Sequence, residues 1–238
     1  MQNNTWAIYR KEIAGFFSSP VAYITLVVFL MISGWFFTSS FFLINESDLR
    51  VLFNIIPLVY MFFIPAITMS LMAREWNTGT LEFLTTLPVS DHQIVVGKFL
   101  AALTLIAAGL GFTLVHFLTL LFIGNHTDIG ALISGYFGLL LVGAAYAAIG
   151  TFGSTLTHNQ ISAFIISFLI IFILFILDKV LIFFPPFLSS VFQFISIDYH
   201  LSNISRGVID SRNLIYLVSL CLLFLLASVR VLEMRKWR

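Results

Sequence analysis

Long apolar stretches separated by short polar joints dominate the pattern of the chain. A bilayer core of about 30 Å needs roughly 20 apolar residues for one helical crossing. The pattern predicts an all-α polytopic membrane protein with six transmembrane helices, at about 20–43, 51–73, 90–123, 131–156, 160–178 and 213–230. These crossings take up most of the chain, so we expect one transmembrane domain over residues 1–238 and no soluble domain.

The segment before the first apolar stretch is amphipathic. A helical wheel of residues 5–17 places five large apolar side chains on one face: Trp6, Tyr9, Ile13, Phe16 and Phe17. Lys11 and Glu12 point elsewhere on the same wheel. Aromatic side chains collect at headgroup depth, so we expect an interfacial helix. A cytosolic helix packed on a partner is the alternative.

Prolines, a capping pattern and glycines mark features within the crossings. Pro57 and Pro65 predict kinks in the second crossing, which neighbouring helices can accommodate. The run Ser90-Asp91-His92-Gln93 is a capping-box pattern and predicts the start of the third crossing. Small residues at spacings of three to five predict a close helix-contact face on the fourth crossing. They are Gly135, Gly138, Gly143, Ala147 and Gly150.

Residues 180–210 differ from the crossings. They contain one apolar piece over 180–187, interrupted by Pro185 and Pro186, a second over 192–197, and then a polar run. Neither apolar piece is long enough to cross a bilayer. We therefore expect short re-entrant or interfacial helices on the outer side of the membrane.

Composition and charge agree with this class. Hydrophobic residues make up 60% of the chain and charged residues only 10%, against about 25% charged in a soluble domain. The net charge is +1 and the basic residues are scattered, which argues against nucleic-acid binding. The single cysteine, Cys221, excludes an internal disulfide. If both termini lie on one side, that side holds eight of the twelve Lys and Arg residues, so the positive-inside rule puts both termini in the bacterial cytoplasm.

The sequence lacks the motifs of an ATPase or a membrane-embedded enzyme. The Gly97-Lys98 pair lacks the rest of a phosphate-binding loop. The histidines are too far apart for a zinc-binding helix: His92, His116, His126, His158 and His200. We expect His116 to be a hydrogen-bonded helix contact and the other four to be interfacial or in loops. The crossings are nearly free of the charges that ion-driven transporters need, so the energy source should lie on another subunit.

Residues 74–91, REWNTGTLEFLTTLPVSD, form the most informative joint. The run Thr78-Gly79-Thr80 favours a helix start, three leucines follow at intervals of three, and Pro88 blocks continuation. The pattern predicts a short amphipathic helix over 78–87, lying across the cytoplasmic end of the bundle. A loop helix that only lies on the surface is the alternative.

The same joint resembles the signature of type-2 ABC exporter permeases, in which an acidic residue, Gly-Thr-Leu/Ile-Glu, an apolar-Thr stretch and Pro-x-Ser form a coupling helix. A second stretch, Tyr199-His200 followed by Asn203-Ile-Ser-Arg-Gly-Val-Ile-Asp210, resembles the gliding-motility (GldF-type) subgroup of these permeases. Arg10-Lys11-Glu12 and Phe17-Ser18-Ser19-Pro20 extend the similarity over essentially the whole chain.

The resemblance implies a half-transporter. It would pair with a second permease, identical or related, and with two ABC ATPase subunits that bind ATP and Mg²⁺, while this chain binds no cofactor, metal or nucleic acid. It implies an N-terminal connecting helix and re-entrant outer helices over 180–210. Trp76 departs from the pattern, because a basic residue is expected there.

The resemblance also assigns roles to particular residues. For the ATPase contact it implies Arg74, Glu75, Thr78, Gly79, Thr80, Leu81, Glu82, Phe83 and Leu84. For the outer re-entrant region it implies Pro185, Pro186, His200, Arg206 and Asp210.

Two function classes remain open. The first is the permease subunit of an exporter in the bacterial inner membrane, in contact with membrane lipids. It is not itself an enzyme and moves a lipidic, amphipathic or polymer-linked substrate across or out of that membrane. The second is an ATP-independent membrane scaffold or a mechanotransmission component of a cell-envelope complex. Co-purification separates the exporter from the scaffold, because a scaffold should come out of detergent without any nucleotide-binding subunit.

Overall fold

A computed structural model describes residues 4–43, 49–80, 89–123, 128–181, 185–208 and 210–235. No strand occurs in these residues. The helices are α1 (Asn4–Ser18), α2 (Pro20–Thr38) with a π-helical extension η1 (Ser39–Leu43), α3 (Arg50–Thr68), α4 (Ser70–Asn77), α6 (Asp91–Ile123), α7 (Ile129–Leu156), α8 (Gln160–Ile176), α9 (Pro186–Ile195), α10 (Ile197–Ser205) and α11 (Ser211–Arg235). The fold is an all-α polytopic membrane bundle.

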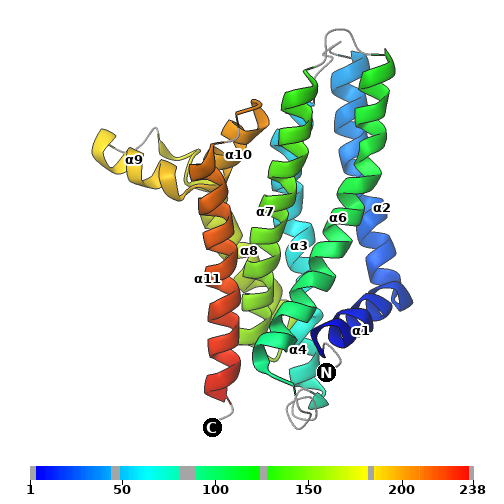
Figure 1. Cartoon of the computed structure of the whole chain (residues 1–238), viewed down its shortest axis with the longest axis vertical. Helices are drawn as coiled ribbons and strands as arrows, with labels where there is room; N and C mark the ends of the chain where they lie inside the picture. Colours follow the sequence, from blue (N-terminus) through cyan, green and yellow to red (C-terminus); the bar gives the residue numbers. More distant parts are fainter. Residues whose placement is uncertain are drawn as a thin grey trace.

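The long helices run side by side along one axis, and the short helices lie at the two ends (Figure 1). Helices α1 and α4 lie at the same end as both chain termini, here called the terminal end. Helices α9 and α10 lie toward the opposite end, here called the α10 end, where α9 projects sideways from the bundle. Both termini at one end is the arrangement that an even number of crossings predicts.

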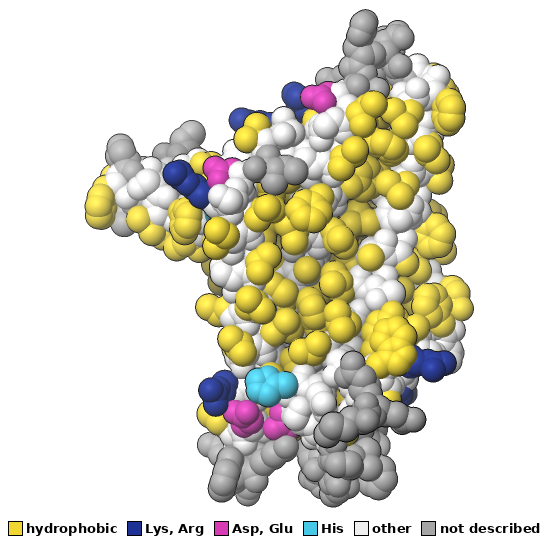
Figure 2. Space-filling view, in the orientation of Figure 1, with side chains coloured by type: hydrophobic (Ala, Val, Ile, Leu, Met, Phe, Trp, Pro, Cys, Tyr) yellow, Lys and Arg dark blue, Asp and Glu magenta, His cyan; other side chains and the backbone are white. Residues whose placement is uncertain are grey.

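The surface divides into an apolar band and two charged ends. In the view of Figure 2, hydrophobic side chains cover the middle of the bundle, and Lys, Arg, Asp and Glu side chains lie toward its ends. This is the distribution expected of a helical bundle whose middle faces hydrocarbon.

Five helical stretches in the described parts of the chain are long and apolar enough to cross a membrane: Pro20–Phe42, Arg50–Asn77, Asp91–Ile123, Ile129–Leu156 and Ser211–Met234. The sixth apolar helix, α8, has 17 residues, which is below the roughly 20 that one crossing needs. The sequence predicted this helix over 160–178, but helix α8 ends at Ile176.

Helix α7 forms the centre of the bundle. In its most apolar stretch 67% of the residues are buried, against 17% in α11 and 22% in α2. Glycines make this close packing possible: a Cβ added at Gly135 would collide with the ring of Phe53, and one at Gly150 with the hydroxyl of Thr68. Both partners belong to α3, so at these two glycines the predicted contact face joins α7 to the second crossing. At Gly138 the same face meets α10.

The second crossing is nearly continuous through its two prolines. Helices α3 and α4 meet at Met69, which keeps helical dihedral angles and donates from its N–H to the carbonyl of Pro65 at 2.8 Å. The helical stretch reaches Asn77, four residues beyond the predicted 73. Glu75 therefore lies on a helix that continues directly out of the bundle.

The predicted capping box at the start of α6 is confirmed. The side chain of Gln93 accepts from the N–H of Ser90 at 3.1 Å, and the hydroxyl of Ser90 accepts from the N–H of Gln93 at 3.4 Å. These reciprocal bonds satisfy two N–H groups that have no partner within the helix. Helix α6 begins at Asp91, within one residue of the prediction.

Candidate functional site

The run Thr78-Gly79-Thr80 follows the last residue of α4, and Thr80 is again helical. The described residues therefore do not contradict the prediction that this run starts a helix. Thr78 caps α4, and its hydroxyl donates to the carbonyl of Arg74 at 3.0 Å. Gly79 has a φ of 71°, in the left-handed region that favours glycine and commonly ends helices. The remainder of the helix predicted over 78–87, including Leu81, Glu82, Phe83 and Leu84, lies outside the described residues.

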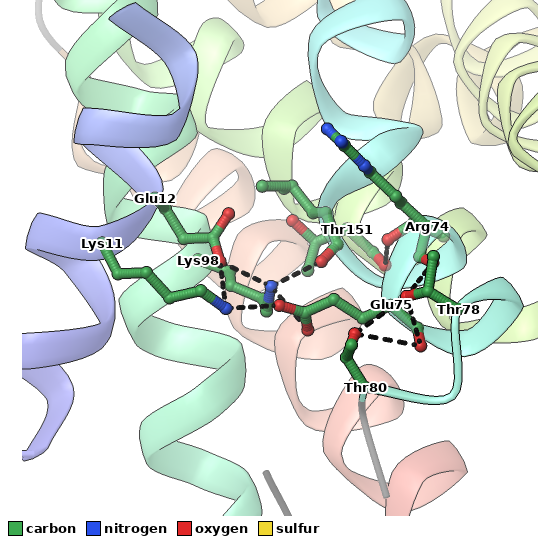
Figure 3. A network of polar contacts seen from close by, with 10 residues as sticks. Lys11, Glu12, Arg74, Glu75, Thr78, Thr80, Lys98 and Thr151 are labelled. Carbon is green, nitrogen blue, oxygen red and sulfur yellow. Dashed lines mark hydrogen bonds and ion pairs between the residues drawn. The ribbon is translucent and has the colours of Figure 1, made fainter. Parts of the chain in front are cut away.

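Lys98 of α6 is the centre of a buried charge cluster at the terminal end (Figure 3). Its side chain is 1% exposed, and its Nζ lies 2.8 Å from Glu12 Oε1 of α1 and 2.9 Å from Glu75 Oε2 of α4. The same Nζ donates to the carbonyl of Leu71 at 2.6 Å. A lysine ammonium has three donors, and these three oxygens give each donor a partner.

Lys11 completes the cluster from α1. Its Nζ lies 2.7 Å from Glu75 Oε1 and 3.7 Å from Glu12 Oε1, and its side chain is 58% exposed. Burial alone lowers the pKa of Lys11, but the hydrogen bond and the charge of Glu75, with that of Glu12, outweigh it and raise the pKa above its usual value. The four residues Lys11, Glu12, Glu75 and Lys98 are called the charge cluster below.

Helix α1 packs into the bundle through a residue that the helical wheel of residues 5–17 did not place on the aromatic face. Trp6 is exposed and stacks on Tyr9 at 4.7 Å, but Ile8 is buried against α6. Gly97 permits this approach, because a Cβ there would come within 3.0 Å of Ile8. Lys11 and Glu12 consequently face α4 and α6 rather than water alone.

Sequence reasoning missed Lys98, which it counted as one more cytoplasmic cation. Lys98 lies in the third crossing, and its buried neighbours Val95, Phe99 and Ala102 follow helical spacing. A buried lysine needs a carboxylate partner, and that requirement is the signal that could have linked it to Glu12 or Glu75. The expectation that the crossings are nearly free of charge is corrected at this position.

The other predicted contact residues of this joint are exposed. The side chain of Arg74 extends away from the ion pairs (Figure 3), and it has no acidic partner among the described residues. Thr78 and Thr80 share a hydrogen bond of 2.9 Å between their hydroxyls. Trp76, at the position where the resemblance expects a basic residue, packs edge-on against His158 with ring centroids 5.2 Å apart.

The predicted outer residues lie at the start of α9, on α10 and between α10 and α11. Pro185 caps α9 and Pro186 is its first residue, as expected of a proline that begins a helix. Arg206 and Asp210 are exposed. His200 is deeply buried, which corrects its prediction as an interfacial or loop side chain.

His200 links α9, α10 and α11. Its Nδ1 lies 2.7 Å from Asn213 Oδ1, its Nε2 lies 2.8 Å from the carbonyl oxygen of Phe194, and its ring stacks on Tyr216 at 4.0 Å. The hydroxyl of Tyr216 donates to the carbonyl of Ile195. His116 is different: it stacks on Phe37, and its buried Nε2 has no hydrogen-bond partner in the described structure, so its predicted hydrogen bond is not found there.

A family model described as ABC-2 family transporter protein matches residues 49–230. The chain belongs to the ABC-2 transporter family. A search of curated proteins finds no match to this sequence. The family is that of membrane permease subunits of ABC transporters, which associate with ABC ATPase subunits.

The matched range gives the charge cluster a family context. It includes Glu75 and Lys98, whereas Lys11 and Glu12 lie before it. In this ABC-2 permease, α1 lies outside the matched range. Its ion pairs attach it to α4 and α6, which lie within that range.

Proposed function

We propose that this chain is the permease subunit of an ATP-driven exporter in the bacterial inner membrane, with ATP and Mg²⁺ bound by separate ABC ATPase subunits. The observation that carries the proposal is the charge cluster, which joins α1, α4 and α6 immediately before residues 78–87. If an ATPase displaced that segment, the ion pairs would transmit the movement to α1, α4 and α6 together. In this role Arg74, Thr78, Gly79 and Thr80 belong to the segment that contacts the ATPase. Glu75 attaches that segment to the bundle through its ion pairs with Lys11 and Lys98.

Six crossings with both termini in the cytoplasm fit this function. Helix α8 would be the sixth crossing: its 17 residues span about 25 Å at 1.5 Å per residue, and a bilayer adapts to a shortfall of a few ångströms. The two termini lie at the same end of the bundle (Figure 1). That end carries Arg10, Lys11, Arg74 and Arg230, which favours a cytoplasmic orientation.

Pairing and cargo follow from the same proposal. The subunit would pair with a second copy or a related permease, because a half-transporter encloses a path only as a pair. The apolar, aromatic-rich crossings, with 27 phenylalanines in the chain, favour a lipidic, amphipathic or polymer-linked cargo.

Substitutions at Gly79 test the coupling role. Proline fixes φ near −65° and cannot adopt the observed 71°, so Gly79→Pro should abolish the ATP hydrolysis that the assembled permease stimulates in the ATPase subunits. Glu82→Arg should have the same effect. Gly79→Asn is the matched control, because asparagine tolerates left-handed backbone, and it should keep most of the stimulation.

The assay is ATP hydrolysis by the complex in liposomes of bacterial inner-membrane lipids, with complex assembly followed by size-exclusion chromatography. Full stimulation in an assembled Gly79→Pro complex would refute the coupling role.

A mechanotransmission component of the gliding-motility type is the second candidate. The observation that favours it is α9, which projects sideways from the bundle (Figure 1) and packs chiefly on α10. A periplasmic protein bound to α9 could receive the movement driven by ATP hydrolysis. The complex would then transmit mechanical work and release no cargo. A purified complex that contains ATPase subunits and a periplasmic protein, but moves no lipid in vesicles, would favour this candidate.

A further inference from the structure

A groove of about 530 Å³ opens beside the charge cluster at the terminal end. It is bounded by α1, α2, the joint between α3 and α4, and the first turns of α6. This volume lies within the range of about 300–1,000 Å³ that is usual for small-molecule sites. The groove is therefore large enough for a headgroup with part of an acyl chain.

The lining of the groove is polar at one end and apolar at the other. Lys11, Arg74 and Glu75 lie at the polar end, whereas Ala22 and Ile67 line the part between α2 and α3. A narrow apolar cleft along α2, α3 and α6 shares Thr25, Ile67 and Leu105 with the groove and extends it toward Phe29. The two hollows together form one amphipathic path.

The charge balance at the polar end favours an anion. Glu12 and Glu75 are both paired with Lys98, whose three donors already have partners. Lys11 is 58% exposed, and Arg74 lines the groove with no acidic partner among the described residues. Three cations thus face two carboxylates, and the exposed cationic groups remain available to a phosphate, for which arginine is well suited.

The groove lies at the depth where lipid headgroups are expected. Trp6 is 58% exposed on α1, and Phe17 contacts Tyr23 edge-on at 5.9 Å where α1 meets α2. Aromatic side chains of this kind mark the membrane–water interface. The charged end of the groove would face the headgroups of the cytoplasmic leaflet and its apolar end the acyl chains.

We propose that this groove binds an anionic, phosphate-bearing amphiphile from the cytoplasmic leaflet, with its headgroup at Arg74 and Lys11 and an acyl chain beside Thr25. The membrane orientation rests on the proposed function, but the groove and its charges do not. A binding measurement without ATP therefore separates failure of this site from failure of the ATPase coupling.

Native mass spectrometry of the full-length chain, delipidated in detergent, tests the proposal. The apparent Kd of the first bound lipid is measured for phosphatidylglycerol and for phosphatidylcholine with the same acyl chains. We expect tighter binding of phosphatidylglycerol. Arg74→Gln should weaken its binding about fivefold, the factor expected for one cationic contact of about 1 kcal/mol with an anionic lipid surface, and Arg74→Lys should restore most of it.

Matched controls identify the site. Arg10→Gln removes an exposed cation of α1 outside the groove, and Val27→Trp adds bulk to an exposed position of α2; both should bind like the wild type. Thr25→Trp fills the joint between the two hollows and should weaken both lipids. Inorganic phosphate at millimolar concentration should not displace phosphatidylglycerol.

Two results would overturn the proposal. One is equal binding by Arg74→Gln and Arg10→Gln variants that share the wild-type thermal unfolding midpoint. The other is full displacement of the lipid by free phosphate, which would indicate a headgroup site without a chain site.

Discussion

The two ends of the bundle each hold short helices on a buried polar residue, but with different chemistry. At the terminal end, Lys98 meets two carboxylates from α1 and α4 within 3 Å. At the α10 end, His200 meets the Asn213 amide and the carbonyl of Phe194. Formal charges hold one end together, and hydrogen bonds to uncharged groups hold the other.

This difference suits different mechanical tasks. A buried ion pair is strongest where its partners stay close, and losing one partner leaves an uncompensated charge. Hydrogen bonds depend steeply on angle, so they fix one orientation of α9 and α10 on α11. We therefore expect the terminal end to move as a unit when an ATPase displaces it, and the α10 end to keep its shape.

Lys98→Met should give the largest loss of stability, because it removes the buried cation that holds the terminal end together. It leaves Glu12 and Glu75 without their buried cation and with only the exposed Lys11 beside them. Removal of one partner from a buried ion pair costs about 3–5 kcal/mol. The free energy of unfolding in mixed micelles is the measurement. Adding Glu12→Gln and Glu75→Gln to the same chain should restore more than half of the loss. A loss below about 1 kcal/mol, the value for an exposed pair, would mean that the cluster does not hold α1 and α4.

His200→Phe should have a smaller effect at the α10 end. The ring can still stack on Tyr216, but the carbonyl of Phe194 and the Asn213 amide lose their partner. Buried polar groups left unpaired cost about 1–3 kcal/mol. Amide hydrogen exchange should become faster in α9 and α10. The permease should still stimulate ATP hydrolysis by the ATPase subunits. The control is Tyr199→Phe on the same helix, which should change the stability little. A loss of coupling in His200→Phe would contradict the separation of the two ends.

The helices were predictable because their signals are local. Apolar runs set α6 and α7 to within about two residues of the helices observed, and the Ser90 and Gln93 capping pair marks the start of α6 within one residue. The proline at the start of α9 is likewise a local signal. Each feature depends on residues a few positions apart, so periodicity and turn chemistry find it.

The charge cluster was not predictable from periodicity because its partners are distant in the chain. Lys98 lies 86 residues from Glu12, and a helical wheel shows which face a residue occupies but not which helix covers that face. The pattern at residues 78–80 predicted a helix start, but it did not show that the left-handed backbone of Gly79 also follows the end of α4. His200 has its partner Asn213 across the turn between α10 and α11, which no local pattern reveals.

Lys179 forms an ion pair at the α10 end, so it tests whether charge also stabilises that end. Its Nζ lies 2.5 Å from Asp198 Oδ2, but its side chain is 55% exposed. A solvent-exposed ion pair contributes about 0–1 kcal/mol, so Lys179→Met should lower the free energy of unfolding far less than Lys98→Met. Burial lowers the pKa of Lys179, but the hydrogen bond and charge of Asp198 outweigh it and raise the pKa above 10.5.

The pH dependence of this pair has a definite sign. A lysine with a raised pKa in the folded state stabilises fully below its unfolded value and loses that contribution as the pH rises through the folded value. The difference between the wild type and Lys179→Met should therefore be constant from neutral pH up to 10.5 and shrink only above it. Added salt should reduce the same difference, because exposed charges are screened. If Lys179→Met lowered the free energy of unfolding as much as Lys98→Met does, and added salt did not change that loss, ion pairs would hold both ends of the bundle. The proposed difference between the two ends would then be wrong.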